Sequence, residues 1–198
     1  MSFKPHPNGG GLVEDTAYVA PTAYVSINAV VKDKARVIGN ARIDDHAQVY
    51  GNALVSDAQV YDRAHVYDYA QVYIYAQVSG DARISGYAHV YDYAQIHGNA
   101  LVFGNAGVFG CALIYGNAQV YDRAHVWECA QVYGDAQVFG DARVSGNAQV
   151  SSTAQVCGNA QVCGNAHLNT RVRVSRRLIL TTNVHVSGED DITEPALK

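Results

Sequence analysis

A six-residue repeat constrains this chain more than any other feature of its sequence. Alanine followed two residues later by valine, isoleucine or leucine recurs every six residues from Ala17 to Leu168, with one five-residue step between Ala53 and Ala58. The two residues before each alanine are often Gly-Asn or Gly-Asp. Within Ala-x-Val-y, strand alternation places Ala and Val on one side and x and y on the other. Glycine and Asn or Asp then predict a sharp bend, because they adopt positive φ at low cost.

Each hexad therefore predicts one short strand and one bend. Three bends of about 120° close a triangular coil, and stacked coils pair as parallel strands about 4.8 Å apart. The repeat predicts roughly ten coils over residues 11–189. Residues 1–10, with Pro5 and Pro7, are expected to fold over the first coil as an N-terminal cap, and residues 190–198 to form a C-terminal tail. One Met and one Trp agree with a narrow interior filled by small side chains.

The hexads, such as Val132-Tyr133-Gly134-Asp135-Ala136-Gln137, resemble those of the bacterial hexapeptide-repeat family. This resemblance implies an all-β fold, a left-handed parallel β-helix. The usual crossover between parallel strands is right-handed, so the left hand rests on the resemblance alone. Tyr, Phe or Ser often follows the aliphatic residue, where that family commonly has Gly or an acid. The end of the chain, Gly188–Thr193 followed by Pro195, resembles the tail of YdcK-like hexapeptide proteins.

Outward positions are expected to form columns, because residues eighteen apart lie on successive coils. Three columns are rich in aromatic residues, one on each face, and a fourth is rich in glutamine. The aromatic columns are Tyr73, Tyr91, Phe109 and Trp127; Tyr50, Tyr67, Ser85, Phe103, Tyr121 and Phe139; and Tyr61, Ser79, His97, Tyr115 and Tyr133. The glutamine column is Gln59, Gln77, Gln95, Leu113, Gln131 and Gln149. Such ladders either stabilise the solenoid or form an interface.

Composition argues against several classes of protein. A net charge of −4 gives little support to nucleic-acid binding. No apolar run approaches the roughly 20 residues of a membrane span. The first ten residues carry no apolar signal core, so a cytoplasmic location without membrane partners is expected. The sequence predicts no cofactor.

The strongest candidate site combines two histidines with a glycine. His89 and His125 share one face two coils apart, and Gly107 stands between them. Without a side chain, Gly107 is expected to leave a notch beside Tyr91, Phe109 and Trp127. These residues are the candidate binding residues, whereas two solvated surface histidines are the plainer interpretation.

The spacing of His89 and His125 resembles that of two zinc ligands in the γ-class carbonic anhydrases. Their third histidine would fall at Ala130, an inward position, and a catalytic zinc needs three protein ligands. His167 and His185 also share a face, but two ligands are too few. We therefore predict no metal site.

The leading functional prediction is a non-catalytic scaffold that presents its ladders to a protein partner or to a second copy of itself. The family resemblance implies a homotrimer. The alternative is an acyltransferase-like enzyme with its site at a subunit interface, since family enzymes use histidine as general base. His89 and His125 would then be the catalytic candidates. Family enzymes usually carry a loop or added domain that shapes the site, and this array has no insertion.

Overall fold

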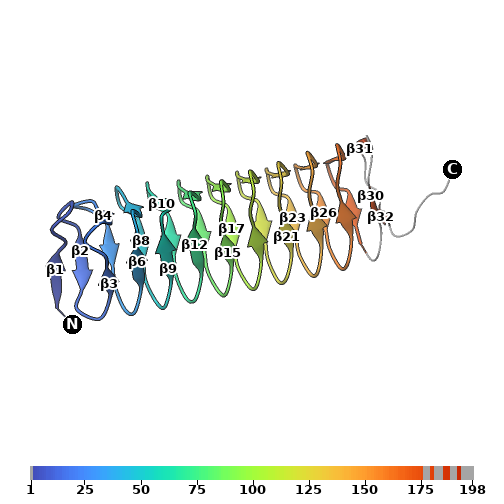
Figure 1. The fold of residues 1–198 in the computed structure, drawn as a ribbon. Coiled ribbons are helices and arrows are strands. Elements are labelled where there is room, and N and C mark those ends of the chain that lie inside the picture. The colour runs from blue at the N-terminus through green and yellow to red at the C-terminus, as the bar shows by residue number, and fades with distance from the viewer. Residues whose placement is uncertain (1, 176–178, 181–184, 188–190, 193–198) are drawn as a thin grey trace.

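The chain forms a β-solenoid in which short strands wind around one straight axis (Figure 1). The computed structural model describes residues 2–175, 179–180, 185–187 and 191–192. The described residues contain strands, bends and turns, and no helix. Three sheets line the three sides, so the predicted all-β solenoid with three strands per coil is confirmed. The hand of the crossover stays a prediction.

Each sheet takes every third strand of the chain. Sheet I contains β1 (Phe3–Pro5), β2 (Leu12–Glu14), β5 (Val30–Val31), β8 (Gln48–Val49), β11 (His65–Val66), β14 (Arg83–Ile84), β17 (Leu101–Val102), β20 (Gln119–Val120), β23 (Gln137–Val138), β26 (Gln155–Val156), β29 (Arg173–Val174) and β32 (Asp191–Ile192). Sheet II contains β4 (Tyr24–Val25), β7 (Arg42–Ile43), β10 (Gln59–Val60), β13 (Gln77–Val78), β16 (Gln95–Ile96), β19 (Leu113–Ile114), β22 (Gln131–Val132), β25 (Gln149–Val150), β28 (His167–Asn169) and β31 (His185–Ser187). Sheet III contains β3 (Tyr18–Val19), β6 (Arg36–Ile38), β9 (Leu54–Ser56), β12 (Gln71–Tyr73), β15 (His89–Val90), β18 (Gly107–Val108), β21 (His125–Val126), β24 (Arg143–Val144), β27 (Gln161–Val162) and β30 (Ile179–Leu180). The outer sides of these sheets are faces I, II and III.

The register between coils follows the sequence spacing. Gln77 pairs with Gln95, eighteen residues later. Across the five-residue step the offset falls to seventeen, so that Leu54 pairs with Gln71. The predicted stacking of outward residues into columns is therefore confirmed.

The core is a narrow column of small side chains. The inward Ala and Val, Ile or Leu positions from Ala23 to Val174 are at most 1% exposed. Alanine lies next to each bend, where the walls converge, and the larger aliphatic residue fills the space between sheets. Close-packed burial of this kind is the main source of stability, since each coil rests only on its neighbours.

The bends use the left-handed backbone conformation that the sequence predicts. Gly116, for example, has φ of +71°. A Cβ at this position would lie 2.9 Å from the backbone nitrogen of Gly134 on the next coil. Close stacking of the coils therefore favours glycine at the bends.

The N-terminal residues pair with the first strands of sheets I and II. Strand β1 pairs antiparallel with β2 at the edge of sheet I. The Asn8 side chain donates to the carbonyl of Ala23, and the Gly11 N–H donates to the carbonyl of Val25. These bonds lay residues 8–11 across the first coil. The predicted tail at 190–198 lies mostly outside the described residues, although Asp191–Ile192 pairs with β29.

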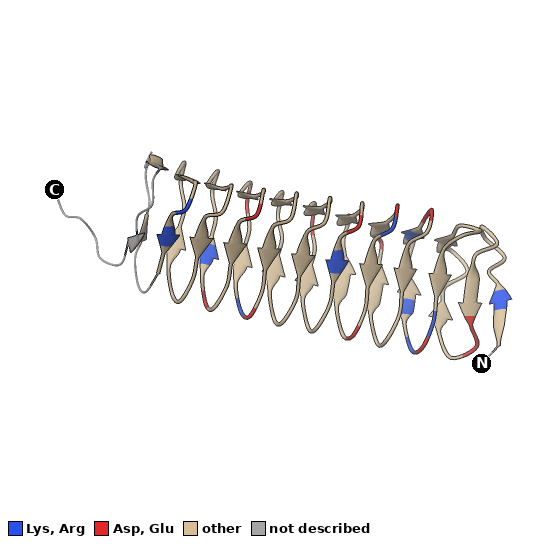
Figure 2. Cartoon of the chain, turned by 180° about the vertical axis from the view of Figure 1, so that it is seen from behind, with Lys and Arg blue, Asp and Glu red and all other residues tan. Residues whose placement is uncertain are grey.

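Charged side chains are spread along the solenoid. Figure 2 shows basic and acidic residues interspersed over its described length, without a continuous stretch of one sign. Several form exposed pairs, such as Arg123 with Asp141. The described part also contains no helix long and apolar enough to cross a membrane.

Candidate functional site

Face III carries the longest run of stacked aromatic rings among the described residues. Tyr73, Tyr91, Phe109 and Trp127 stack with nearly parallel rings at centroid distances of 5.1, 4.8 and 5.8 Å. The in-register strands of sheet III set this spacing, which suits offset stacking. Burial raises the pKa of Tyr73 and of Tyr91 above 10.0, so both hydroxyl groups stay protonated at neutral pH.

The two candidate histidines contact the rings of this ladder edge-on. His89 meets the ring of Tyr73 edge-on at 6.3 Å, and His125 meets Phe109 in the same way at 6.5 Å. Each imidazole therefore contacts the aromatic residue of the preceding coil. His89 and His125 both pair with Gly107, from opposite sides.

The space above Gly107 is filled by His125. A Cβ at Gly107 would lie 2.8 Å from Cδ2 and 3.3 Å from Nε2 of that imidazole. Gly107 is buried in consequence. The side chain of His125 thus occupies the notch expected there. Its imidazole lies over the backbone of Gly107 on the preceding coil.

A shallow hollow lies on the other side of His125. Phe109, His125, Trp127 and Arg143 line it, and its volume is about 230 Å³. Three of these are sequence-predicted candidates, while Arg143 was not among them. Tyr91 and His89 do not line this hollow.

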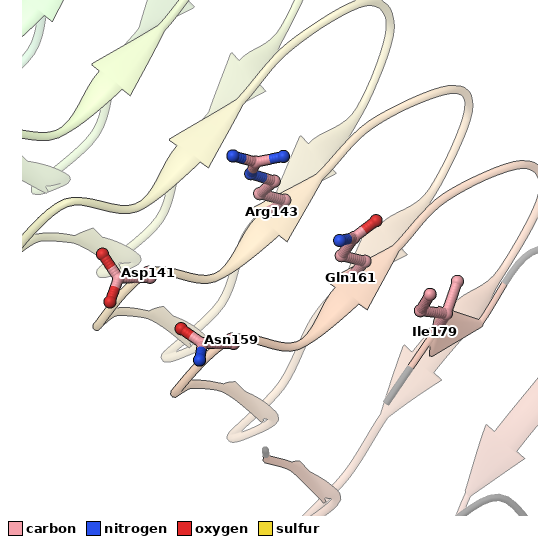
Figure 3. Close-up of a pocket in the computed structure, with 5 residues that line it drawn as sticks. All are labelled: Asp141, Arg143, Asn159, Gln161 and Ile179. Carbon is pink, nitrogen blue, oxygen red and sulfur yellow. The ribbon is translucent and has the colours of Figure 1, made fainter. Parts of the chain in front are cut away.

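Arg143 also borders a second hollow of about 290 Å³ on face III (Figure 3). Asp141, Asn159, Gln161 and Ile179 complete its lining. In Figure 3 the side chains of Arg143 and Gln161 project from neighbouring strands on the same side of the sheet.

The charge of Arg143 is not balanced by the nearby carboxylate. Asp141 is held by Arg123 at 2.8 Å, and within the described part of the chain Arg143 forms no ion pair. A guanidinium beside aromatic rings and amides can hold a carboxylate or phosphate group. Among the described residues no group of three or more His, Cys, Asp or Glu side chains is placed to hold a metal ion.

The tyrosines at the bends were not among the residues predicted from the sequence. Tyr69 and Tyr87 stack at 4.9 Å along one edge of face III, and Tyr75 and Tyr93 stack at 5.6 Å along the other. All four are at least half exposed. The available signal was their departure from the usual Asn or Asp before alanine, as in Ile74-Tyr75.

The five-residue step produces a third hollow, at the edge between faces III and II. It has a volume of about 390 Å³. Its lining consists of Asn40, Asp57, Ala58, Gln59, Tyr75, Gln77 and Tyr93. A missing residue, rather than an inserted loop, therefore creates this recess.

Comparison with known proteins supports the repeat. A family model described as the YdcK Beta solenoid repeat matches residues 47–57, 76–92, 94–110 and 136–152. The search of curated proteins gives no match. Among solved structures, the crystal structure of UDP-N-acetylglucosamine O-acyltransferase (LpxA) from Moraxella catarrhalis RH4 matches with 15% identity and a TM-score of 0.33. That match covers 86% of this chain and 71% of the other.

The matched segments lie in the stacked coils and include the strands of the face III ladder from β15 to β18. They lie outside the C-terminal segment whose sequence resembles the YdcK-like tail. The chain is thus a β-solenoid of hexapeptide coils, four segments of which match the YdcK β-solenoid repeat.

Proposed function

We propose that this protein is a non-catalytic binding solenoid that associates with a protein partner through face III. The observation that carries the proposal is the clustering of exposed apolar side chains. Of the ten exposed large hydrophobic residues among those described, five border face III on two adjacent coils. They are Tyr69, Ile74, Tyr75, Tyr87 and Tyr93. Exposed apolar surface of this kind is typical of interaction sites.

The rigidity of the platform supports this function. The backbone beneath the ladder is fixed on both sides by neighbouring coils, as in the bonds from Tyr91 N to Val108 O and from Phe109 N to Val126 O. Stacking further restricts the rings of Tyr91, Phe109 and Trp127. Little conformational entropy would be lost when a partner covers rings that are already ordered.

A second copy of the chain is the partner we propose. Association of identical chains brings like net charges together, and the net charge of −4 on 198 residues opposes this only weakly. Acidic and basic residues are interspersed along the solenoid (Figure 2), which allows charges to alternate across a side-by-side contact. The resemblance to hexapeptide-repeat proteins favours three copies around a common axis.

The test is a triple substitution, Tyr91→Ser, Phe109→Ser and Trp127→Ser. The molar mass of the wild type and the variant would be measured by size-exclusion chromatography with light scattering. We expect the wild type to elute as an oligomer and the variant as a monomer with an unchanged β-sheet circular dichroism spectrum.

The matched control is Phe103→Ser, Tyr121→Ser and Phe139→Ser. This ladder on face I has the same stacking, with centroid distances of 4.9 and 5.0 Å, but no exposed tyrosine pair flanks its rings on those coils. Both triple variants lose stacking of about 0.5–1.5 kcal/mol per ring pair. A monomeric wild type contradicts self-association, and equal loss of association in both variants contradicts the assignment to face III.

Acyl transfer at a subunit interface is the second candidate. The specific observation is that His125 is exposed beside a hollow also lined by Arg143, which forms no ion pair with any described residue. An imidazole in such a position can serve as a general base. Thiol release from acetyl-coenzyme A in the presence of amine or hydroxyl acceptors would test it. Release that His125→Asn abolishes, while the oligomer persists, would favour this candidate over the scaffold.

A further inference from the structure

The hollow beside Tyr75 arises from a local change in how two coils pair. At ordinary bends, an N–H of the earlier coil donates to a carbonyl of the later coil, as Tyr93 N does to Gly110 O at 2.9 Å. At the short bend this direction is reversed, since Ile74 N donates to Ser56 O and Tyr75 N donates to Asp57 O at 3.1 and 2.8 Å. The coil with the missing residue cannot reach as far outward, so the bend of the next coil overhangs it.

The backbone of the overhanging bend is strained. Ile74 and Tyr75 have φ of +51° and +60° in succession. Positive φ is unusual for a β-branched residue such as isoleucine. Strained residues of this kind often mark binding sites, where a side chain must be held in a particular direction. Here the conformation holds Tyr75 outward, with 62% of the residue exposed.

Tyr75 and Tyr93 both line the hollow. Their rings stack at a centroid distance of 5.6 Å with an interplanar angle of 14°. The residue below Tyr75 is Asp57, which also lines the hollow and whose carboxylate accepts hydrogen bonds from the backbone N–H of Asn40 at 2.9 Å and from the Ser56 hydroxyl at 3.0 Å. The recess therefore has an aromatic wall made of two stacked rings.

The rest of the lining is polar and nearly neutral. Gln59 and Gln77 contribute amides that make no side-chain hydrogen bond within the described residues, and each amide can both donate and accept. Asp57 is the only charged residue among those that line the hollow, and no lining residue is cationic. A ligand that fits this wall has one flat apolar side and several hydroxyl groups at its edge, and carries no negative charge.

We propose that this hollow binds a neutral pyranose unit of an oligosaccharide. The axial C–H groups of the sugar would pack on the ring of Tyr75, and its hydroxyl groups would exchange hydrogen bonds with Gln59, Gln77 and Asp57. The volume of about 390 Å³ falls within the range of about 300–1,000 Å³ for small-molecule sites. Tyr75 and Tyr93 also border the surface proposed for self-association, so a bound sugar and a second copy of the chain are expected to compete there.

The test uses the full chain and three neutral probes, maltohexaose, cellohexaose and hexa-N-acetylchitohexaose. Saturation-transfer NMR and titration of the intrinsic tyrosine fluorescence would report binding. We expect at least one probe to bind with a Kd of about 0.1–10 mM, which is the weak end of the affinity scale. Polygalacturonate fragments are expected to bind more weakly, because their carboxylates meet Asp57.

Two variants locate the site. Tyr75→Ala should weaken binding about tenfold or more, whereas Tyr69→Ala, which removes another exposed stacked tyrosine from the opposite edge, should leave it unchanged. Insertion of a glycine between Ser56 and Asp57 restores the six-residue spacing, so it should fill the recess and abolish binding while circular dichroism stays unchanged. The proposal is overturned if none of the three probes binds at about 10 mM, or if the Tyr75→Ala or glycine-insertion chain binds as the wild type does.

Discussion

The carboxylate of Asp62 accepts a hydrogen bond at 2.9 Å from the backbone N–H of Gly80, which stands at the same bend one coil later. The same bond recurs at other bends, where the N–H of a glycine donates to an aspartate carboxylate of the preceding coil. The donor and acceptor pairs are Gly51 and Asp33, Gly86 and Asp68, and Gly140 and Asp122. It satisfies a backbone donor that points along the solenoid axis. Aspartate therefore replaces glycine at several bends, although its φ is positive there.

This bond predicts losses of stability of different size for two substitutions at Gly116. Gly116→Ala should lower the free energy of unfolding by about 1–2 kcal/mol, because alanine disfavours the left-handed conformation. Its Cβ also lies 2.9 Å from Gly134 N. Gly116→Asp should lower it by less, because the carboxylate can accept the Gly134 N–H. Urea unfolding followed by circular dichroism measures both, and equal losses would contradict the role of the carboxylate.

The narrow core predicts that both smaller and larger side chains destabilise the coil around β19. Ile114→Ala should lower the free energy of unfolding by about 2–5 kcal/mol, since the cavity cannot collapse between fixed coils. Ala118→Val should lower it by about 1–3 kcal/mol by overpacking the wall. Leu113→Ala, on the outer side of the same strand, is the control and should cost less than about 1 kcal/mol. A tolerated Ala118→Val would show that the wall has spare room.

Because of His65, we predict that the folded protein loses stability in mild acid. Burial lowers the pKa of this half-buried imidazole below 6.5, and the cations of Arg83 and Lys32 lower it further, while Asp81 opposes them. The unfolded chain therefore binds the proton more readily than the folded chain, so stability falls as the pH drops below 6.5 towards the lowered value. Above 6.5 this contribution to stability is constant.

The measurement is the thermal midpoint between about pH 7.5 and pH 5 for the wild type and His65→Gln, a window set by the histidine titration. Glutamine occupies the same column one coil earlier, at Gln48, so the substitution suits the site. The variant should show a shallower fall in midpoint with acid. Parallel curves for the two proteins would show that His65 does not govern this window.

We predict that the N-terminal strand β1 protects the solenoid against end-to-end association with other copies. Without residues 2–9, the edge of β2 would lose its antiparallel partner β1 and expose free backbone groups. Pro5 in β1 lacks an N–H, which makes that strand a poor template for further pairing. The truncated chain should form species of higher mass at high concentration, as measured by light scattering. An unchanged mass would show that β1 does not limit growth.

The repeat made most of the fold predictable. Alternation within each hexad assigned inward and outward positions, and the stacking of Tyr91 on Phe109 followed from a spacing of eighteen residues. Candidate sites were less predictable, because a repeat gives the position of a Cα but not the direction of a side chain. His125 was placed on the correct face, but its position over Gly107 and the hollow beside Arg143 depend on the rotamers of neighbouring coils.

The sequence by itself determined the solenoid, because local alternation and bend-forming residues agree in hexad after hexad over the stacked coils. Only the tertiary structure decided where the surface of the solenoid is hollow and where its aromatic rings are exposed. The five-residue step is visible in the sequence, but the reversed hydrogen bonds at Ser56 and Asp57 and the overhang of Tyr75 arise only when two coils of unequal length are stacked. The positions of hollows and exposed rings depend on contacts between coils, whereas the path of the backbone around each coil depends on contacts within each hexad.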